Sequence, residues 1–141
     1  MTSEAPGGRP EPAPGDPGPT LYDAVGGMPF FEALVDRFYE GVAADPILLR
    51  LYPEPADLAA ARRRLSLFLA QYWGGPATYS DERGHPRLRA RHFPFAIGPL
   101  ERDRWLVHMR DAIARLDPPP EIAARLHAYF AMAAEAMRNQ D

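Results

Sequence analysis

The four histidines are the side chains best suited to chemistry in this sequence of 141 residues, which contains no cysteine. The lack of cysteine excludes thiolate catalysis, disulfides and Cys-ligated zinc or iron–sulfur sites. A metal would therefore be held by His, Asp, Glu, Tyr or a macrocycle. Zinc is disfavoured because His92 has no second histidine at metal-ligand spacing. A histidine that acts alone suits an iron whose other four equatorial ligands come from a porphyrin.

His92 differs from the other histidines in its surroundings. We expect it at the end of a short helical turn, followed by the apolar and aromatic residues 93–97. A lone histidine in such a place is more often a hydrogen-bonded core residue than a ligand, so the spacing alone leaves both interpretations open. We expect His108 and His127 on solvent-exposed helix faces, and His85 to anchor a loop.

The arginines and the polar aromatic residues are the remaining candidates. Most arginines are interpreted as a solvated surface, but Arg64 and Arg91 lie close to the predicted pocket wall. There a guanidinium could pair with a carboxylate of a buried ligand. Tyr39, Tyr52 and Trp105 occur where aromatic residues usually form the core, yet each has a polar group that needs a partner when buried.

Helices are the elements expected to position these residues, which makes the chain an all-α protein. Residues 1–19 are rich in Pro and Gly and are predicted to be a disordered tail, followed by one domain over residues 20–141. Apolar spacing of three and four residues predicts the main helices. We expect them over 29–42, from a cap at Asp57 to 73, over 99–116, and from about 120 to 137, with short helices after Thr20 and over 46–51. Residues 76–98 are expected to be irregular, except for a brief helix between 86 and 91.

The composition limits the class of function. A net charge of −3 and the lack of a basic surplus argue against binding to nucleic acid. The first residues carry no apolar run, and no stretch approaches the roughly 20 apolar residues that a membrane span needs. We therefore expect no signal peptide and no membrane span, and a cytoplasmic location.

Several strings of the sequence resemble group II truncated haemoglobins, a family of bacterial globins. The resemblance runs from about Leu21 to the end of the sequence, and its long central string is unusual. The strings are LYDAVGG (21–27), RFYEGV (37–42), LYPE (51–54), FLAQYWGGPATYSDERGHPRLRARHFPF (68–95) and ERDRWL (101–106).

The resemblance implies a two-over-two helical sandwich that holds haem b, with His92 as the proximal ligand to the iron. It implies that the loop over residues 86–95 replaces the usual proximal helix. On the distal side, Tyr39, Tyr52 and Trp105 would face bound O2. Ala61 would occupy the place of the distal histidine of classical globins, with Leu65 one turn on. The implied propionate contacts are Arg64, Tyr79 and Arg91, and the implied ring contacts are Phe68, Leu88, Phe95, Ile97 and Met109.

Three functions remain open from the sequence. The first is a haem protein that binds O2 and other diatomic ligands, for redox or detoxification chemistry rather than simple transport. The second is an enzyme, a haem peroxidase or nitric oxide dioxygenase, which would need a reductase partner because the chain has no flavin or nicotinamide domain. The third is a helical interaction module without a cofactor. Globins of this group are often dimers, so the resemblance also allows a homodimer.

Overall fold

The computed structural model describes residues 20–52 and 54–141, and every regular element in this part of the chain is a helix. The prediction of an all-α protein is therefore confirmed. The predicted tail over residues 1–19 lies outside the described residues. Among the described helices, none combines the length and the apolar character needed to cross a bilayer.

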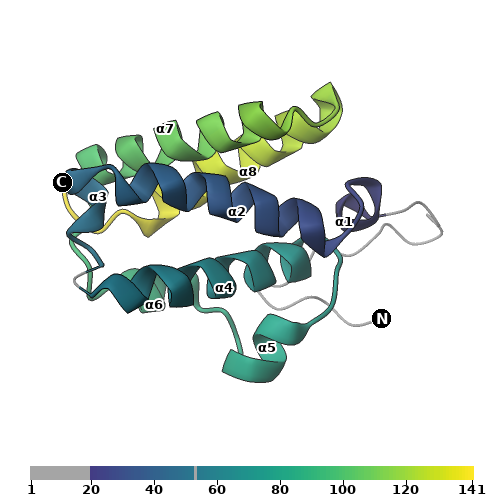
Figure 1. Ribbon diagram of the computed structural model, residues 1–141. Coiled ribbons are helices and arrows are strands. Elements are labelled where there is room, and N and C mark those ends of the chain that lie inside the picture. The colour runs from purple at the N-terminus through teal and green to yellow at the C-terminus, as the bar shows by residue number, and fades with distance from the viewer. Residues whose placement is uncertain (1–19, 53) are drawn as a thin grey trace.

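Four long helices make up most of the structure, and four short ones connect them (Figure 1). In chain order the described helices are α1 (Leu21–Ala24), α2 (Met28–Ala43), α3 (Pro46–Leu49), α4 (Pro55–Tyr72), α5 (Thr78–Arg83), α6 (Leu88–His92), α7 (Pro99–Leu116) and α8 (Pro120–Met137).

The long helices form two layers of two helices each. Helices α2 and α4 pack together as one layer, and α7 and α8 as the other. Helix α2 also packs against α7, so it lies between α4 and the pair of α7 and α8 in Figure 1. The short helix α6 contacts α8, while α5 contacts α4. This arrangement confirms the predicted two-over-two sandwich, and it leaves the segment that contains His92 between the end of α8 and α4.

Helix α2 supplies the centre of the core. Pro29 lies in its first turn, where the missing proline N–H costs no hydrogen bond. Its apolar side is fully buried, as its spacing predicts, and each large side chain removed from water there stabilises the fold by roughly 1.5–3 kcal/mol. The buried residues of this side are Phe31, Leu34, Val35, Phe38, Tyr39 and Val42.

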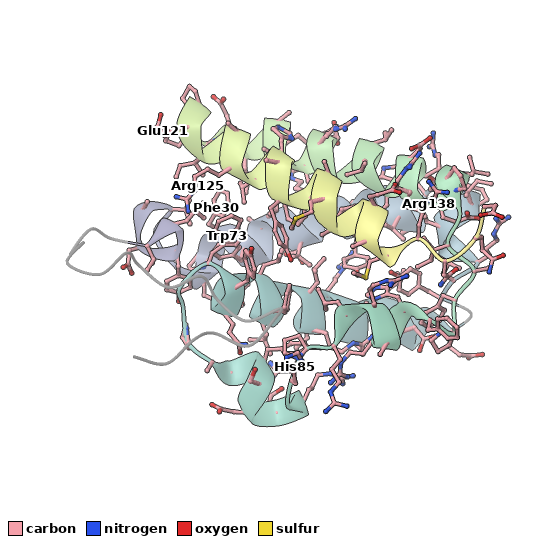
Figure 2. The ribbon with its side chains drawn as sticks, turned by 180° about the vertical axis from the view of Figure 1, so that it is seen from behind. Phe30, Trp73, His85, Glu121, Arg125 and Arg138 are labelled. Atoms are coloured by element: carbon pink, nitrogen blue, oxygen red, sulfur yellow. The ribbon has the colours of Figure 1, made fainter. Side chains whose placement is uncertain are left out.

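Aromatic side chains close the end of the bundle near α1. Arg125 on α8 lies over the ring of Trp73, with its guanidinium carbon 5.2 Å from the ring centre. Figure 2 shows both residues at the same end as Phe30. A cation over an aromatic face contributes roughly 0.5–1 kcal/mol at an exposed site, so this contact helps to join α8 to the end of α4.

The start of α4 differs from the prediction. We expected Asp57 to cap the helix, but α4 begins at Pro55, and Asp57 lies within its first turn. The Asp57 carboxylate accepts a hydrogen bond from the N–H of Glu54 at 3.1 Å. Proline is compatible with the first helical position, so the helix begins at Pro55, two residues before Asp57.

Residues 76–98 are more helical than expected, because α5 and α6 both form there. Helix α5 was missed entirely. Its position depends on Gln71 of α4, which accepts a hydrogen bond from the Ser80 N–H at 2.9 Å and donates one to the Ser80 hydroxyl at 2.7 Å. A helix of six residues is not stable without such tertiary contacts.

The prediction that His108 is solvated is wrong. Its side chain is only 16% exposed, and its Nε2 lies 2.7 Å from Oδ2 of the buried Asp45, which also accepts from Arg104 Nε at 2.9 Å. Gly41 of α2 permits this approach, because a Cβ there would lie 2.4 Å from His108 Nδ1. Burial opposes ionisation of Asp45, but hydrogen bonds from His108, Arg104 and the Ile47 N–H outweigh it and lower the pKa of the carboxyl to about 2. His127 is partly buried rather than exposed.

Candidate functional site

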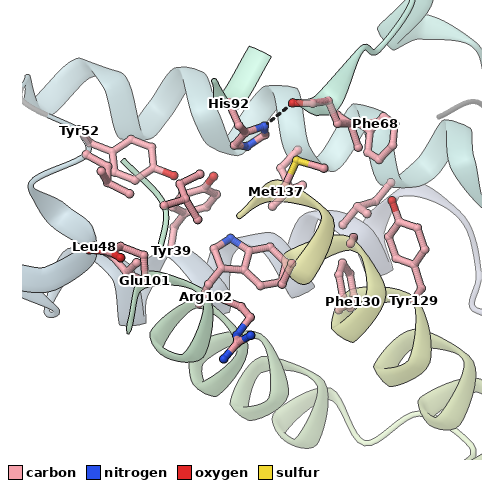
Figure 3. Close-up of a pocket in the computed structure, with 18 residues that line it drawn as sticks. Tyr39, Leu48, Tyr52, Phe68, His92, Glu101, Arg102, Tyr129, Phe130 and Met137 are labelled. Carbon is pink, nitrogen blue, oxygen red and sulfur yellow. Dashed lines mark hydrogen bonds between the residues drawn. The ribbon is translucent and has the colours of Figure 1, made fainter. Parts of the chain in front are cut away.

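A cavity of about 610 Å³ lies between α4 and the segment from α5 to residue 97. We call it the outer lobe. An adjoining inner lobe of about 150 Å³, drawn in Figure 3, reaches between α7 and α8. The two lobes share much of their walls. Predominantly apolar walls with a few polar groups are typical of sites for small molecules and cofactors. The residues that line both lobes are Tyr39, Leu51, Tyr52, Leu65, Phe68, Leu88, His92 and Ile97.

His92 is the last residue of α6 and lines both lobes. Its Nδ1 lies 2.7 Å from the carbonyl oxygen of Leu88, one turn earlier, as the dashed line in Figure 3 marks. A carbonyl oxygen only accepts hydrogen bonds, so Nδ1 carries the proton of the neutral imidazole. Nε2 then carries the lone pair, which is the form of histidine that ligates a metal.

Two phenols face each other on the wall of the cavity, at the labelled side chains of Tyr39 and Tyr52 in Figure 3. Their ring centres are 6.0 Å apart, and the rings are nearly perpendicular. Burial raises the pKa of Tyr39 well above its ordinary value, and it also raises the pKa of Tyr52. Both phenols therefore stay protonated at neutral pH. A hydrogen bond between them uses one hydroxyl proton, which leaves the other available to donate.

Trp105 of α7 lines the inner lobe and packs against Phe38 and Phe130, with ring centres 4.9 and 5.6 Å away. Packing on both sides restricts the indole to one orientation. Together with Tyr39 and Tyr52, which line the same lobe, Trp105 brings a third polar donor to the cavity. Sequence reasoning had named all three residues, and the structure brings them together.

Most of the other predicted contact residues lie on the outer lobe. Ala61 and Phe68 are buried there, and Phe95 is 42% exposed at its edge. The remaining predicted residues on this wall are Arg64, Leu65, Tyr79, Leu88, Arg91 and Ile97. Met109 is the exception, because it is fully buried in the core and is absent from the residues that line either lobe.

Arg91 lines the outer lobe, but most of its donors bind the protein itself. Its Nε donates to the carbonyl of Pro86 at 2.5 Å, and its Nη2 donates to the carbonyls of Arg83 and His85 at 2.9 and 3.2 Å. Its guanidinium carbon also lies 5.8 Å from the centre of the Tyr79 ring. Since a guanidinium has five N–H groups, Nη1 is left to face a ligand.

Arg64 and Arg83 also line the outer lobe, and Asp57 is a carboxylate on the same wall. Arg83 was not among the predicted residues, because the helix that carries it, α5, was expected to be irregular. Cations at the edge of an apolar cavity favour a ligand that carries carboxylates outside an apolar body.

Sequence reasoning also missed most of the inner lobe. The helical pattern indicated that the α8 residues were buried, but it could not separate a wall of a cavity from packed core. Glu101 and Arg102 on α7 were not among the predicted contact residues. The inner-lobe residues outside the predicted set are Leu48, Leu51, Leu69, Glu101, Arg102, Tyr129, Phe130, Ala133, Ala134 and Met137.

The donor set suits one kind of metal centre. Within residues 20–52 and 54–141, no three His, Cys, Asp or Glu side chains gather as a metal site. A metal on His92 would therefore depend on a macrocycle for its remaining ligands. The apolar walls, the arginines at the edge and the available Nε2 of His92 all fit a flat metal macrocycle with carboxylate substituents.

Comparisons with known proteins agree with this geometry. The family model for bacterial-like globins matches residues 20–139. The Group 2 truncated hemoglobin YjbI of Bacillus subtilis is 42% identical over 119 residues, which are 84% of this chain and 88% of that protein. The solved structure of a thermostable hemoglobin from Thermobifida fusca is 59% identical, covers 86% of this chain and 98% of its own, and has a TM-score of 0.83. The group II truncated hemoglobin of Bacillus anthracis is 37% identical, covers 89% and 96%, and has a TM-score of 0.82.

Proposed function

Because this chain belongs to the bacterial-like globins, and among them to the group II truncated haemoglobins, we propose that it holds haem b in the outer lobe, with His92 as the protein ligand to the iron. The observation that carries the proposal is the 2.7 Å contact between His92 Nδ1 and the Leu88 carbonyl. Because this contact keeps the proton on Nδ1, the unprotonated Nε2 of the cavity-lining imidazole is the atom available to ligate the iron. Such a hydrogen bond also fixes the ring and makes the ligand more basic.

Different side chains around the cavity would contact different parts of the haem. Phe68 and Leu88 would offer apolar surface to the ring. We expect Arg64, Tyr79 and the Nη1 group of Arg91, which line the outer lobe, to contact the two propionates. Arg83 adds a third positive charge on the same wall.

Bound haem would supply a ferrous iron that takes up O2 and other diatomic ligands. The indole of Trp105 and the remaining hydroxyl proton of the Tyr39–Tyr52 pair would then be available to donate hydrogen bonds to such a ligand. A hydrogen bond to a charged acceptor is worth about 1.5–3 kcal/mol, which corresponds to a roughly ten- to hundredfold tighter complex. Two such donors make release of O2 slow, which suits redox or detoxification chemistry better than simple transport.

Turnover as a peroxidase or nitric oxide dioxygenase is the second candidate. The small side chain of Ala61 leaves room on the wall of the outer lobe, where peroxide or nitric oxide can enter. Electrons would come from a separate reductase. Steady-state turnover with a supplied electron donor distinguishes this enzyme from a protein that only binds O2, because binding alone gives no continued consumption of substrate.

A visible absorption spectrum of the purified, haem-supplemented protein tests the proposal. We expect a strong Soret band that moves on reduction and on exposure to O2 or CO, and that is lost or altered in His92→Ala. His85→Ala is the matched control, because His85 is an exposed loop histidine whose Nδ1 accepts a hydrogen bond from Arg87 N–H at 3.1 Å. No Soret band after added haem would overturn the proposal and favour a helical interaction module. A normal spectrum in His92→Ala would overturn the ligand assignment.

A further inference from the structure

The residues that follow α8 lie against the segment that carries His92. The N–H groups of Asn139 and Gln140 both donate to the carbonyl oxygen of Ile97, at 2.8 and 3.0 Å. In return, the Ile97 N–H donates to Oδ1 of Asn139 at 2.9 Å. The N–H and the carbonyl of Ile97 are therefore both bound by residues 139 and 140, which lie more than forty residues later in the sequence.

The Asn139 side chain also reaches back along this segment towards His92. Its Nδ2 donates to the carbonyl oxygen of Phe95 at 2.8 Å, and it lies 3.4 Å from the carbonyl oxygen of His92 itself. One carboxamide thus contacts three backbone groups between His92 and Ile97. Only an amide does this, because a carboxylate at position 139 would accept from the Ile97 N–H but would have no hydrogen to donate to the carbonyls.

The segment has little local structure to hold it. Helix α6 has five residues, and a helix of that length is not stable in isolation. Pro94, two residues after the last residue of α6, has no N–H to donate. Within the segment, the Phe95 N–H donates to the His92 carbonyl at 3.0 Å. The contact of α6 with α8, and the bonds from Asn139 just beyond α8, add the long-range support for the backbone of His92.

We propose that Asn139 is a positioning residue for His92: its carboxamide holds the backbone over residues 92–97, and so sets the direction in which His92 Nε2 enters the cavity. This inference rests on the proposed role of His92 as the iron ligand. Asn139 itself touches neither the haem nor its ligand. Its effect passes through the backbone, in the way that partners outside the ligand set tune metal affinity by 10–100-fold.

Two substitutions of Asn139 test the inference against a matched neighbour. Asn139→Ala removes all three side-chain contacts, and Asn139→Asp keeps the acceptor for Ile97 N–H while removing the donor to the carbonyls. Gln140→Ala is the control, because Gln140 contributes its main-chain N–H, which alanine retains, and its side chain is exposed. Circular dichroism first establishes that each variant is folded. If Asn139→Ala does not fold, the comparison is made with Asn139→Asp.

Three measurements separate positioning from mere support of the fold. In Asn139→Ala, which removes the acceptor, we expect the Ile97 amide to exchange hydrogen about two- to tenfold faster, whereas Asn139→Asp keeps the acceptor and is expected to leave this rate near that of the wild type. In both variants we expect the iron–histidine stretching band in the resonance Raman spectrum to shift or broaden, and haem transfer to an excess of apomyoglobin to accelerate by roughly 10–100-fold. Gln140→Ala is expected to match the wild type in all three.

The outcomes are distinguishable. An Asn139→Ala protein with a wild-type iron–histidine band and a wild-type rate of haem loss would overturn the inference, even if the Ile97 amide exchanged faster, since the contact would then be structural only. That result would leave the proposed function intact. A wild-type protein without a Soret band overturns the proposed function and the inference together, and it is recognised before any variant is compared.

Discussion

We expect the substitution Asp45→Asn to lower the free energy of unfolding, by an amount that follows from the contacts of the Asp45 carboxylate. Asp45 is 4% exposed, its Oδ1 accepts from the Ile47 N–H at the start of α3, and its Oδ2 binds His108 and Arg104 of α7. Folding lowers the pKa from 3.8 to about 2. At 1.4 kcal/mol per pH unit this corresponds to roughly 2–3 kcal/mol of stability, which Asp45→Asn is expected to remove at neutral pH.

The direction of the pH dependence follows from the lowered pKa. A carboxyl with a lower pKa in the folded protein contributes its full stability above the pKa of the unfolded chain, and loses it as the pH falls through the folded value. The difference in unfolding free energy between wild type and Asp45→Asn is therefore expected to be roughly 2–3 kcal/mol at pH 7 and to decline between about pH 4 and pH 2. Urea denaturation followed by circular dichroism at several pH values measures it.

Asp111→Asn is the matched control, because Asp111 and its partner Arg115 are both 57% exposed on one face of α7. An exposed pair at this spacing contributes about 0.3–0.5 kcal/mol, so the control is expected to lose little. If Asp45→Asn lost no more than the control at pH 7, the electrostatic argument for Asp45 would be refuted. A difference that persisted undiminished at pH 2 would show that packing, not charge, is responsible.

Two further substitutions address the cavity and the contact of α2 with α7. Trp105→Phe keeps an aromatic ring beside Phe38 but removes the indole N–H. We therefore expect O2 to leave the haem-loaded protein ten- to hundredfold faster in stopped-flow measurements. An unchanged rate would exclude Trp105 as a donor to the ligand. Gly41→Ala places a Cβ 2.4 Å from His108 Nδ1 and is expected to lower the free energy of unfolding by about 1–3 kcal/mol. Thermal unfolding measures that loss, and a variant as stable as the wild type would mean that His108 moves aside freely.

The long helices could be predicted from the sequence because their signals are local. Helix α7 spans Pro99–Leu116, the range that its apolar spacing and flanking prolines predict. Helix α2 buries the side that its periodicity indicates. Such patterns extend over four or more turns, so errors in single residues do not change the result.

The short helices and the polar contacts could not be predicted in the same way. Helix α5 has fewer than two turns, and it is held by Gln71 on another helix, a contact that no local pattern contains. His108 shares a polar stripe with Arg104, which indicates solvent, but that stripe meets the carboxylate of Asp45 instead. Polar residues that pair across the fold look like surface residues in sequence.

The candidate site was predicted only with help from the family resemblance. Spacing alone left His92 undecided between a ligand and a core residue. The tautomer that frees Nε2 comes from the Leu88 carbonyl, whose direction depends on the local backbone of α6. Asn139 was missed because it lies beyond the last periodic residue of α8, where neither apolar spacing nor a motif marks it.

The three carbonyls bound by Arg91 have a consequence for how tightly a ligand is held. They belong to residues 83, 85 and 86, which join α5 to α6, so one guanidinium connects three points of this loop. Because all three bonds lie within the chain, the entropy of ordering the loop is lost during folding. Binding then orders fewer residues and retains more of its free energy as affinity. A lysine at position 91 would donate from one ammonium in place of a planar fork, so retention of the charge alone would not preserve this preorganisation.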